Sequence, residues 1–206
     1  MELGGRRHRS QYTLSRDPAM PAAAMPDVQI CRWNQLSSGP QRDRWLGDLD
    51  HVFFSSSARQ SFASAEEKAA FRERWLGRYL VNFPQYAWVA LDGTQRVVGY
   101  LVGSLDNPAR DPLFADLSHF ALFSVLTDRY PAQLHVNLDA AWRGRGIGGE
   151  LVTAFVRQAQ AAGCPGVHVV TSRGARNVGF YLANGFATRG HSKGEGHELL
   201  FLGRDL

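Results

Sequence analysis

The sequence has few of the residues that mark extracellular, membrane-spanning or metal-binding proteins. It contains only two cysteines, Cys31 and Cys164, in 206 residues, which is too few for a disulfide framework or a zinc cage. Mean hydropathy is -0.27, and no apolar run approaches the ~18 residues that a membrane span needs. We therefore expect a cytoplasmic protein that makes no membrane contact and holds no metal.

Lysine is also scarce. Of the 23 basic residues only Lys68 and Lys193 are lysines, and the rest are arginines. The planar guanidinium of arginine suits phosphate groups, and the sequence pI is about 9.4. A net charge of +4 is nevertheless too small to indicate a nucleic-acid binder, so we expect no nucleic-acid partner.

A third absence is local. No Asp or Glu occurs between Leu151 and Gly194, whereas five arginine and lysine side chains in the same stretch give it a charge of +5. A basic segment without acids favours a ligand that carries several phosphates.

The chain divides into a short leader and one domain. Residues 1–27 have few large apolar side chains and end in an Ala/Pro tract, so we expect a flexible N-terminal leader. The remaining residues, 28–206, fit a single domain by length. A hydrophobic content of 44% with 20% charged residues is typical of a folded globular chain.

Apolar spacing and turn residues predict alternating strands and helices. The expected strands are residues 28–33, 86–91, 97–104, 133–138 and 167–171, followed by a closing hairpin formed by Phe186 and residues 198–202. The expected helices are residues 40–54, a helix opened by Ser64 and ended by Pro84, 145–162 and 175–184. The long segment 105–130 is expected to contain one helix, residues 114–126, and to cover a substrate. This order predicts an α/β fold with a mixed sheet.

The segment most informative about chemistry follows the strand at 133–138. Four glycines and two arginines lie within seven residues, Arg143-Gly-Arg-Gly-Ile-Gly-Gly149, where a strand leads directly into a helix. Glycines let the backbone amides approach an anion closely, and the start of a helix adds partial positive charge. We expect a pyrophosphate site made by Arg143, Gly144, Arg145, Gly146, Ile147, Gly148 and Gly149.

Two other phosphate motifs fit this turn less well. A P-loop requires Lys and Ser/Thr after its last glycine, but Glu150 and Leu151 follow Gly149. The spelling G-x-G-x-x-G of a dinucleotide fold is present, but that motif needs a carboxylate about 20 residues later. None occurs there.

The turn and a second motif together resemble a known family. Arg143-x-x-Gly146-x-Gly148 after a strand resembles the acetyl-CoA signature of the GNAT (GCN5-related) N-acetyltransferases. Asn177-Val-Gly-Phe-Tyr181-Leu-Ala-Asn-Gly-Phe186 resembles the second signature of that family. Within the family, the run Tyr-Pro-Ala-Gln-Leu-His-Val at 130–136 is similar to the acetyltransferase-like domains related to that of O-GlcNAcases. The resemblance implies a mixed, mostly antiparallel sheet flanked by helices, with a β-α-β-α-β half that binds acetyl-CoA.

The resemblance also implies an activity and several residue roles. It implies an acetyl-CoA-dependent N-acetyltransferase, in which a primary amine of a small molecule or peptide attacks the thioester directly in a ternary complex. Tyr181 would be the acid beside the sulfur, the Leu138 amide would polarise the thioester carbonyl, and Asn177 would contact the coenzyme. Gly174 stands where many relatives have a pantetheine-binding asparagine, and the strand at 133–138 lacks their glutamate base.

The base must therefore come from elsewhere, because an amine of pKa ~10 is mostly protonated at neutral pH. His135 shares one strand face with Asn137, opposite Leu134, Val136 and Leu138, and is our first candidate. The other contenders are Asp128, Tyr130, Asp139 and His119. The alternative function is a non-catalytic acyl-CoA-binding or interaction module of the same fold. A homodimer is left open.

Overall fold

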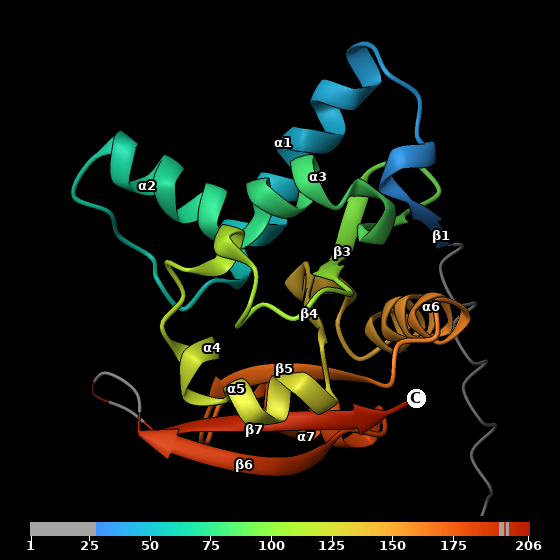
Figure 1. Ribbon diagram of the computed structural model, residues 1–206. Coiled ribbons are helices and arrows are strands. Elements are labelled where there is room, and N and C mark those ends of the chain that lie inside the picture. The colour runs from blue at the N-terminus through green and yellow to red at the C-terminus, as the bar shows by residue number, and fades with distance from the viewer. Residues whose placement is uncertain (1–27, 194–195, 197) are drawn as a thin grey trace, which may run out of the picture.

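The computed structural model describes residues 28–193, 196 and 198–206, and the leader expected at 1–27 lies outside them. A seven-stranded sheet has helices against both faces (Figure 1). The strands are β1 (Gln29–Arg32), β2 (Trp88–Leu91), β3 (Val97–Ser104), β4 (Ala132–Leu138), β5 (Gly166–Ser172), β6 (Ala187–Lys193) and β7 (Glu198–Asp205). The helices are α1 (Pro40–Ser56), α2 (Ala65–Arg72), α3 (Arg78–Asn82), α4 (His119–Leu122), α5 (Ser124–Arg129), α6 (Ile147–Ala161) and α7 (Asn177–Ala183).

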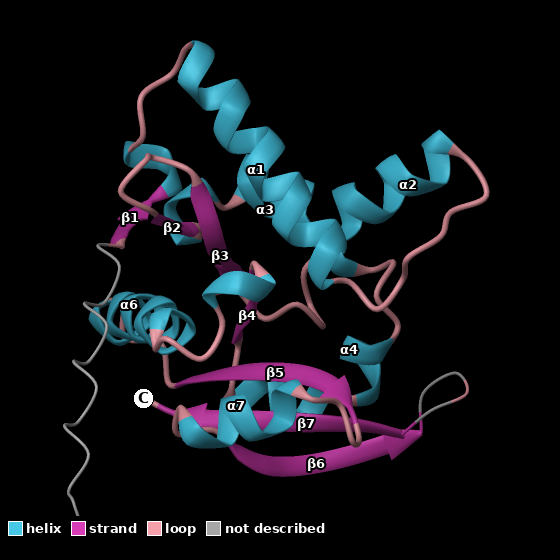
Figure 2. Ribbon diagram, turned by 180° about the vertical axis from the view of Figure 1, so that it is seen from behind, coloured by secondary structure: helices cyan, strands magenta, loops and turns pink. Residues whose placement is uncertain are grey.

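The sheet has the order β1-β2-β3-β4-β5-β7-β6, and every neighbouring pair is antiparallel except β4 and β5. This confirms the predicted mixed, mostly antiparallel sheet. The parallel contact is short: only Ala132–Val167 and Gln133–His168 pair, although each strand has seven residues. Figure 2 shows why, since β3 and β4 run steeply across the view whereas β5, β7 and β6 lie almost level. Beyond the two pairs, residues 134–138 and 169–172 no longer pair with each other.

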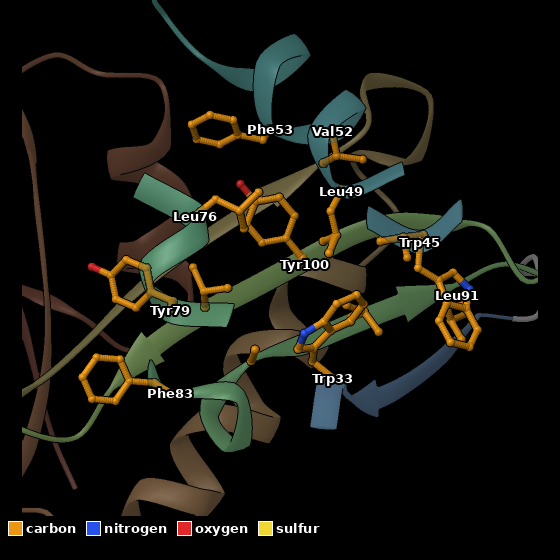
Figure 3. Close-up of a cluster of buried hydrophobic side chains, with 14 of the residues drawn as sticks. Trp33, Trp45, Leu49, Val52, Phe53, Leu76, Tyr79, Phe83, Leu91 and Tyr100 are labelled. Carbon is orange, nitrogen blue, oxygen red and sulfur yellow. The ribbon is translucent and has the colours of Figure 1, made fainter. Parts of the chain in front are cut away.

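One core lies between the sheet and the helices α1 and α3. The apolar face predicted for the first helix, Trp45, Leu49, Val52 and Phe53, is the buried face of α1. Figure 3 shows Leu49 and Leu76 pointing towards Tyr100 of β3, which is 1% exposed. This face of the sheet therefore carries a rigid aromatic and aliphatic layer beneath α1 and α3.

A second core covers the opposite face. Leu151, Val152 and Phe155 of α6 are each fully buried, and they pack with Tyr181 of α7 and Leu134 of β4. The repeat of apolar residues along α6 accounts for this burial, because positions three and four apart share one helix face. Thus α6 and α7 follow β4 and β5 as the predicted β-α-β-α-β half requires.

The long helix predicted from Ser64 to Pro84 forms in three parts. The Ser64 hydroxyl accepts from the Glu67 amide at 3.2 Å, which confirms the predicted cap. Between α2 and α3 the chain makes one wider π-helical turn, η2 (Glu73–Gly77). Such turns insert an extra residue into a helix and often accompany functional sites. Trp75 lies within this turn.

The single helix predicted at residues 114–126 is wrong. The segment contains a 3-10 turn, η4 (Pro112–Phe114), and two short helices, α4 and α5. Its apolar residues Phe114, Leu117, Phe120 and Phe123 are spaced strictly three apart, and each amide donates to the carbonyl three residues earlier at 2.9–3.1 Å. A three-residue period belongs to the tighter 3-10 winding, which rarely continues for long.

The start of α6 also differs slightly from the prediction. The helix begins at Ile147 rather than at residue 145, because Gly146 adopts a left-handed conformation with φ of 82°. The turn after β4 is therefore two residues longer than expected.

Candidate active site

The turn between β4 and α6 presents backbone amides. Gly144 and Gly146 have φ of 74° and 82°, and a side chain at either would meet nothing within 4 Å. Backbone conformation, rather than lack of space, therefore requires glycine there. The first bond of α6 runs from the Glu150 amide to the Gly146 carbonyl at 3.1 Å. Within the described chain, the six preceding amides, residues 144–149, donate no hydrogen bond.

The two arginines of the turn lie differently. Arg145 is exposed, with its guanidinium 5.2 Å from the centre of the Trp142 ring. Arg143 is half-buried and turns back towards β4: its Nε donates to the Leu138 carbonyl at 3.1 Å and its Nη2 to the Ser56 hydroxyl at 3.2 Å. Arg145 is thus free to meet an anion, whereas Arg143 ties the turn to the end of α1.

The later residues of the turn fix its position on the sheet. Ile147 is 4% exposed in the second core. A Cβ atom on Gly148 would lie 3.0 Å from Phe180 and 3.2 Å from Leu138, and one on Gly149 would lie 3.1 Å from Asn184. These two glycines allow the first turn of α6 to pack closely against β4 and α7.

Near the end of β4, the edge that faces β5 has backbone amides with no strand partner. The Asp139 amide donates to the Val98 carbonyl of the neighbouring β3 at 3.0 Å. Because successive amides alternate between the two edges of a strand, the amides of Leu138 and Val136 point to the other edge. That edge is unpaired with β5 from residue 134 onwards.

Tyr181 lies beside this edge. It is 3% exposed within α7. Burial raises the pKa of its hydroxyl, and the backbone amide of Val136 opposes that shift. The hydroxyl therefore stays protonated at neutral pH and can donate a proton.

Asn177 is the first residue of α7 and is exposed, with its Oδ1 accepting from the Thr171 hydroxyl at 2.9 Å. Asn177 follows β5, whereas the glycine turn follows β4, so the two lie on either side of the opening where these strands stop pairing. The structure thus places the two predicted signatures on opposite sides of the separating strands.

His135 lies on the other face of β4, as its alternation with Leu134 predicts. Its ring is 5.4 Å from that of Trp75 and 5.7 Å from that of Tyr79. Burial, together with the nearby His119, lowers the pKa of His135 to about 4. The imidazole is therefore neutral at pH 7 and has a free lone pair, although it is a weaker base than an exposed histidine. Two residues on, the side-chain Nδ2 of Asn137 donates to the Tyr100 hydroxyl at 2.8 Å.

The other contenders for the base have structural roles. Asp128 is exposed and ion-paired with Arg110 at 2.7 Å. Asp139 accepts from the Ala141 amide at 2.9 Å and lies 3.4 Å from His51. His119 stacks on Trp75 with ring centres 6.0 Å apart, and its charge is the second cause of the lowered pKa of His135.

Tyr130, the remaining contender, is 1% exposed and packs in a third cluster with Phe201. Burial raises the pKa of its hydroxyl. It is therefore a weak candidate for a base that must accept a proton near pH 7.

A groove of about 680 Å³ separates α1 and α2. Asp50 and Arg72 face each other across it at 2.6 Å, and Lys68 lines its rim. The groove lies near the end of β4, because His51, one of its lining residues, is 3.4 Å from Asp139, the residue after that strand.

Sequence reasoning missed Ser56 and Gln133. The side chain of Gln133 is 2% exposed and accepts from the Tyr79 hydroxyl at 3.1 Å. Its two-residue spacing from His135 was a signal, since alternate residues share a strand face. Nothing in the sequence around Ser56 indicates its contact with residues more than 80 positions away.

The described residues show neither a metal-binding cluster nor a membrane-spanning helix. Over residues 28–193, 196 and 198–206, no three His, Cys, Asp or Glu side chains are grouped as metal ligands would be. In that same part of the chain, no helix has the length and apolar character needed to cross a bilayer.

Comparison with known proteins gives a family and a fold. A sequence profile described as the acetyltransferase (GNAT) family matches residues 50–186, more than half of the chain. A protein named SsHAT aligns over 87% of this chain and 98% of its own, with 24% identity and a TM-score of 0.66. PH1933 from Pyrococcus horikoshii OT3 aligns over 87% and 99%, with 17% identity and a TM-score of 0.64.

A third similar structure is the NatC complex bound to Gag peptide and CoA, in which the matching chain aligns over 87% of this chain and 99% of its own, with 14% identity and a TM-score of 0.57. At these identities the solved structures establish the fold. The narrower likeness to O-GlcNAcase-related domains is not confirmed by these matches and stays a prediction.

Proposed function

The chain belongs to the acetyltransferase (GNAT) family, and from that premise we propose that it is an acetyl-CoA-dependent N-acetyltransferase acting on a primary amine. The acceptor amine is that of a small molecule or a peptide, and it attacks the thioester directly in a ternary complex. The observation that carries this proposal is the row of amides at residues 144–149, which have no acceptor within the described chain.

Those amides suit the diphosphate of coenzyme A. They stand at the start of α6, a helix of 15 residues, where the helix dipole also favours an anion. Exposed Arg145 supplies a formal positive charge beside them. The pantetheine arm would then enter between β4 and β5, past Asn177, to bring its thioester to the amide of Leu138.

The proposed chemistry uses three groups at that point. The Leu138 amide polarises the thioester carbonyl as negative charge develops on its oxygen. Tyr181 donates a proton to the departing sulfur, and His135 accepts one from the amine. An ammonium acceptor loses two protons overall: one reaches the sulfur by way of Tyr181, and the other leaves to solvent. The products are the acetylated amine, the coenzyme A thiol and one proton.

The acceptor would approach from the opposite face, along the groove between α1 and α2. His51, which lines that groove, lies 3.4 Å from Asp139, the residue after β4. NatC, which shares the fold, is described with both a Gag peptide and CoA bound, and a peptide amine is therefore one of the two acceptor classes proposed.

The test combines binding with turnover. Calorimetry should detect acetyl-CoA binding, and Arg145→Glu should weaken it by roughly tenfold, since one phosphate contact is lost and a like charge gained. Arg44→Glu is the matched control, because Arg44 is an exposed helical arginine on α1, away from the turn. Thiol release with a panel of amines then measures activity.

Two results would contradict the proposal. Absence of binding, or equal affinity in the Arg145 and Arg44 variants, would reject the coenzyme site. Tight binding without turnover on any amine would instead favour the alternative, a non-catalytic acyl-CoA-binding module.

A further inference from the structure

Four buried side-chain polar atoms have no hydrogen-bond partner within the described chain, and three of them belong to neighbouring residues. The three are Gln133 Nε2, His135 Nε2 and His168 Nε2. Buried polar atoms in native proteins nearly always have a partner, either in the chain or in an ordered water. The three side chains come from the adjacent strands β4 and β5, so one shared partner is the simplest explanation for all three nitrogens.

The sheet brings these three side chains to one face. Gln133 and His135 are two residues apart on β4 and so point the same way. Gln133 and His168 form one of the two pairs that join β4 to β5, and directly paired residues also share a face. The cluster, which includes the proposed base His135, consequently lies where the two strands begin to separate.

The tautomer of His168 follows from its other nitrogen. Nδ1 lies 2.5 Å from the Tyr130 carbonyl oxygen. A carbonyl only accepts, so Nδ1 carries the hydrogen, and His168 Nε2 is left as an acceptor. Gln133 Nε2 is a donor, because its Oε1 already accepts from the Tyr79 hydroxyl.

We propose that one buried water joins these nitrogens and fixes the tautomer of His135. The water accepts from Gln133 Nε2, donates to His168 Nε2 and accepts from His135 Nε2–H. A buried water commonly makes about three hydrogen bonds to groups of this kind. Gln133 and His168 are thereby positioning residues, which act on the substrate only through His135.

The consequence for catalysis rests on the proposed function. Nε2 of His135 is buried, although the residue as a whole is partly exposed, so Nδ1 is the ring nitrogen left to meet an acceptor amine. With the hydrogen held on Nε2, Nδ1 keeps its lone pair and takes the proton of the amine. The imidazolium then returns that proton to solvent, and the water itself is not consumed.

The direct test is spectroscopic and needs no activity. In the full-length ¹⁵N-labelled protein, long-range nitrogen–proton spectra should show His135 as the Nε2–H tautomer and His168 as the Nδ1–H tautomer. His135→Gln and His168→Gln identify the two signals among seven histidines. A high-resolution crystal structure should show one water within about 3.2 Å of all three nitrogens.

The kinetic test uses Gln133→Met, which keeps the length of the side chain but removes its donor, beside Tyr79→Phe, which accounts for the hydrogen bond that Gln133 Oε1 also loses. We expect a mixture of tautomers at His135 and a kcat lower by roughly tenfold, less than the roughly 10²–10⁴-fold that losing a general base costs. KM for acetyl-CoA should not change. Thr127→Val is the control, because Thr127 is 0% exposed and bonds only within α5, to the Ser124 carbonyl.

The outcomes separate this proposal from the proposed function. An Nδ1–H tautomer at His135, or no water at the cluster, overturns it even in an active enzyme. Shifted tautomer signals in Gln133→Met with unchanged kcat overturn the positioning role. If no amine is acetylated, the spectra and the crystal structure still decide whether the water holds His135.

Discussion

The half of the molecule formed by β4, α6, β5 and α7 offers a ligand mostly backbone groups, whereas the half formed by α1, η2 and α3 offers side chains. In the first half, amides 144–149 and the Leu138 amide are free within the described chain. In the second, the groups on offer are the side chains of Trp75, His135 and the Asp50–Arg72 pair. Backbone groups can serve any ligand with the same phosphates, whereas side chains select one acceptor.

This difference explains which half of the site could be predicted from the sequence. A backbone site needs glycine at particular φ values, and such needs leave a fixed spacing in the sequence. A side-chain site can be built from residues distant in sequence, as the contact of Ser56 with Arg143 illustrates. Motifs therefore identify the coenzyme side and say little about the acceptor side.

The largest effect is expected in the coenzyme half, from a substitution of Tyr181, the proposed acid. Tyr181→Phe should lower kcat by roughly 10²-fold or more, because the departing thiolate loses its proton donor. The affinity for acetyl-CoA should stay the same, since the ring remains packed beside Phe186. Thiol-release kinetics and calorimetry measure the two quantities. An unchanged kcat would assign the acid role to another group.

The next effect concerns the histidines between the two halves. Burial lowers the pKa of His135 to about 4 and that of His168 to about 3, whereas an unfolded histidine titrates near ~6.5. The unfolded chain therefore binds more protons below that pH, so stability is complete above pH ~6.5 and declines as pH falls towards the folded values. Each histidine contributes a slope of at most about 1.4 kcal/mol per pH unit.

Urea unfolding at pH 7, 6 and 5 measures this slope. In His168→Gln the free energy of unfolding should fall less steeply between pH 6.5 and 4 than in the native protein. Equal slopes in the two proteins would mean that His168 is not held neutral in the fold.

A smaller effect tests the packing that places the amide row. Gly148→Val should destabilise the fold by about 1–3 kcal/mol, because the new side chain meets Phe180 and Leu138 at contact distances already as short as 3.0 Å. Gly179→Val is the matched control: it lies in α7 with nothing within 4 Å, so only helix propensity changes, by about 0.5 kcal/mol or less. Gly148→Val should lower both the melting temperature and the affinity for acetyl-CoA more than Gly179→Val does.

The same contrast shows which parts of the fold could be predicted from the sequence. The mixed sheet, the face of α1 and the cap at Ser64 could be predicted because each depends on local spacing. The segment 114–126 could not, because an apolar repeat of three fits a helix loosely and the tighter turns are selected by packing. The π-helical turn at Glu73–Gly77, which contains Trp75, likewise has no local signature.

Within the candidate site, the glycine turn was recognised but the direction of Arg143 was not. Its guanidinium finds the Leu138 carbonyl and Ser56, a choice set by how α1 crosses the end of β4. The grouping of Gln133 and His168 beside His135 was missed for the same reason, since these residues meet only through the pairing of β4 with β5. Tertiary pairing, rather than residue type, decides these contacts.

The smallest effect examines the acceptor half through Trp75. Its ring meets His135 edge-on at 5.4 Å and stacks on His119 at 6.0 Å, so it forms the wall nearest the proposed base. Trp75→Ala should raise KM for the amine by roughly tenfold or less, since an aromatic contact contributes about 0.5–1.5 kcal/mol, while the affinity for acetyl-CoA stays constant. Trp75→Phe is the control for lost packing: it keeps a ring in place and should recover most of the KM. If the alanine variant instead weakened acetyl-CoA binding, the division between a backbone half for the coenzyme and a side-chain half for the acceptor would be wrong.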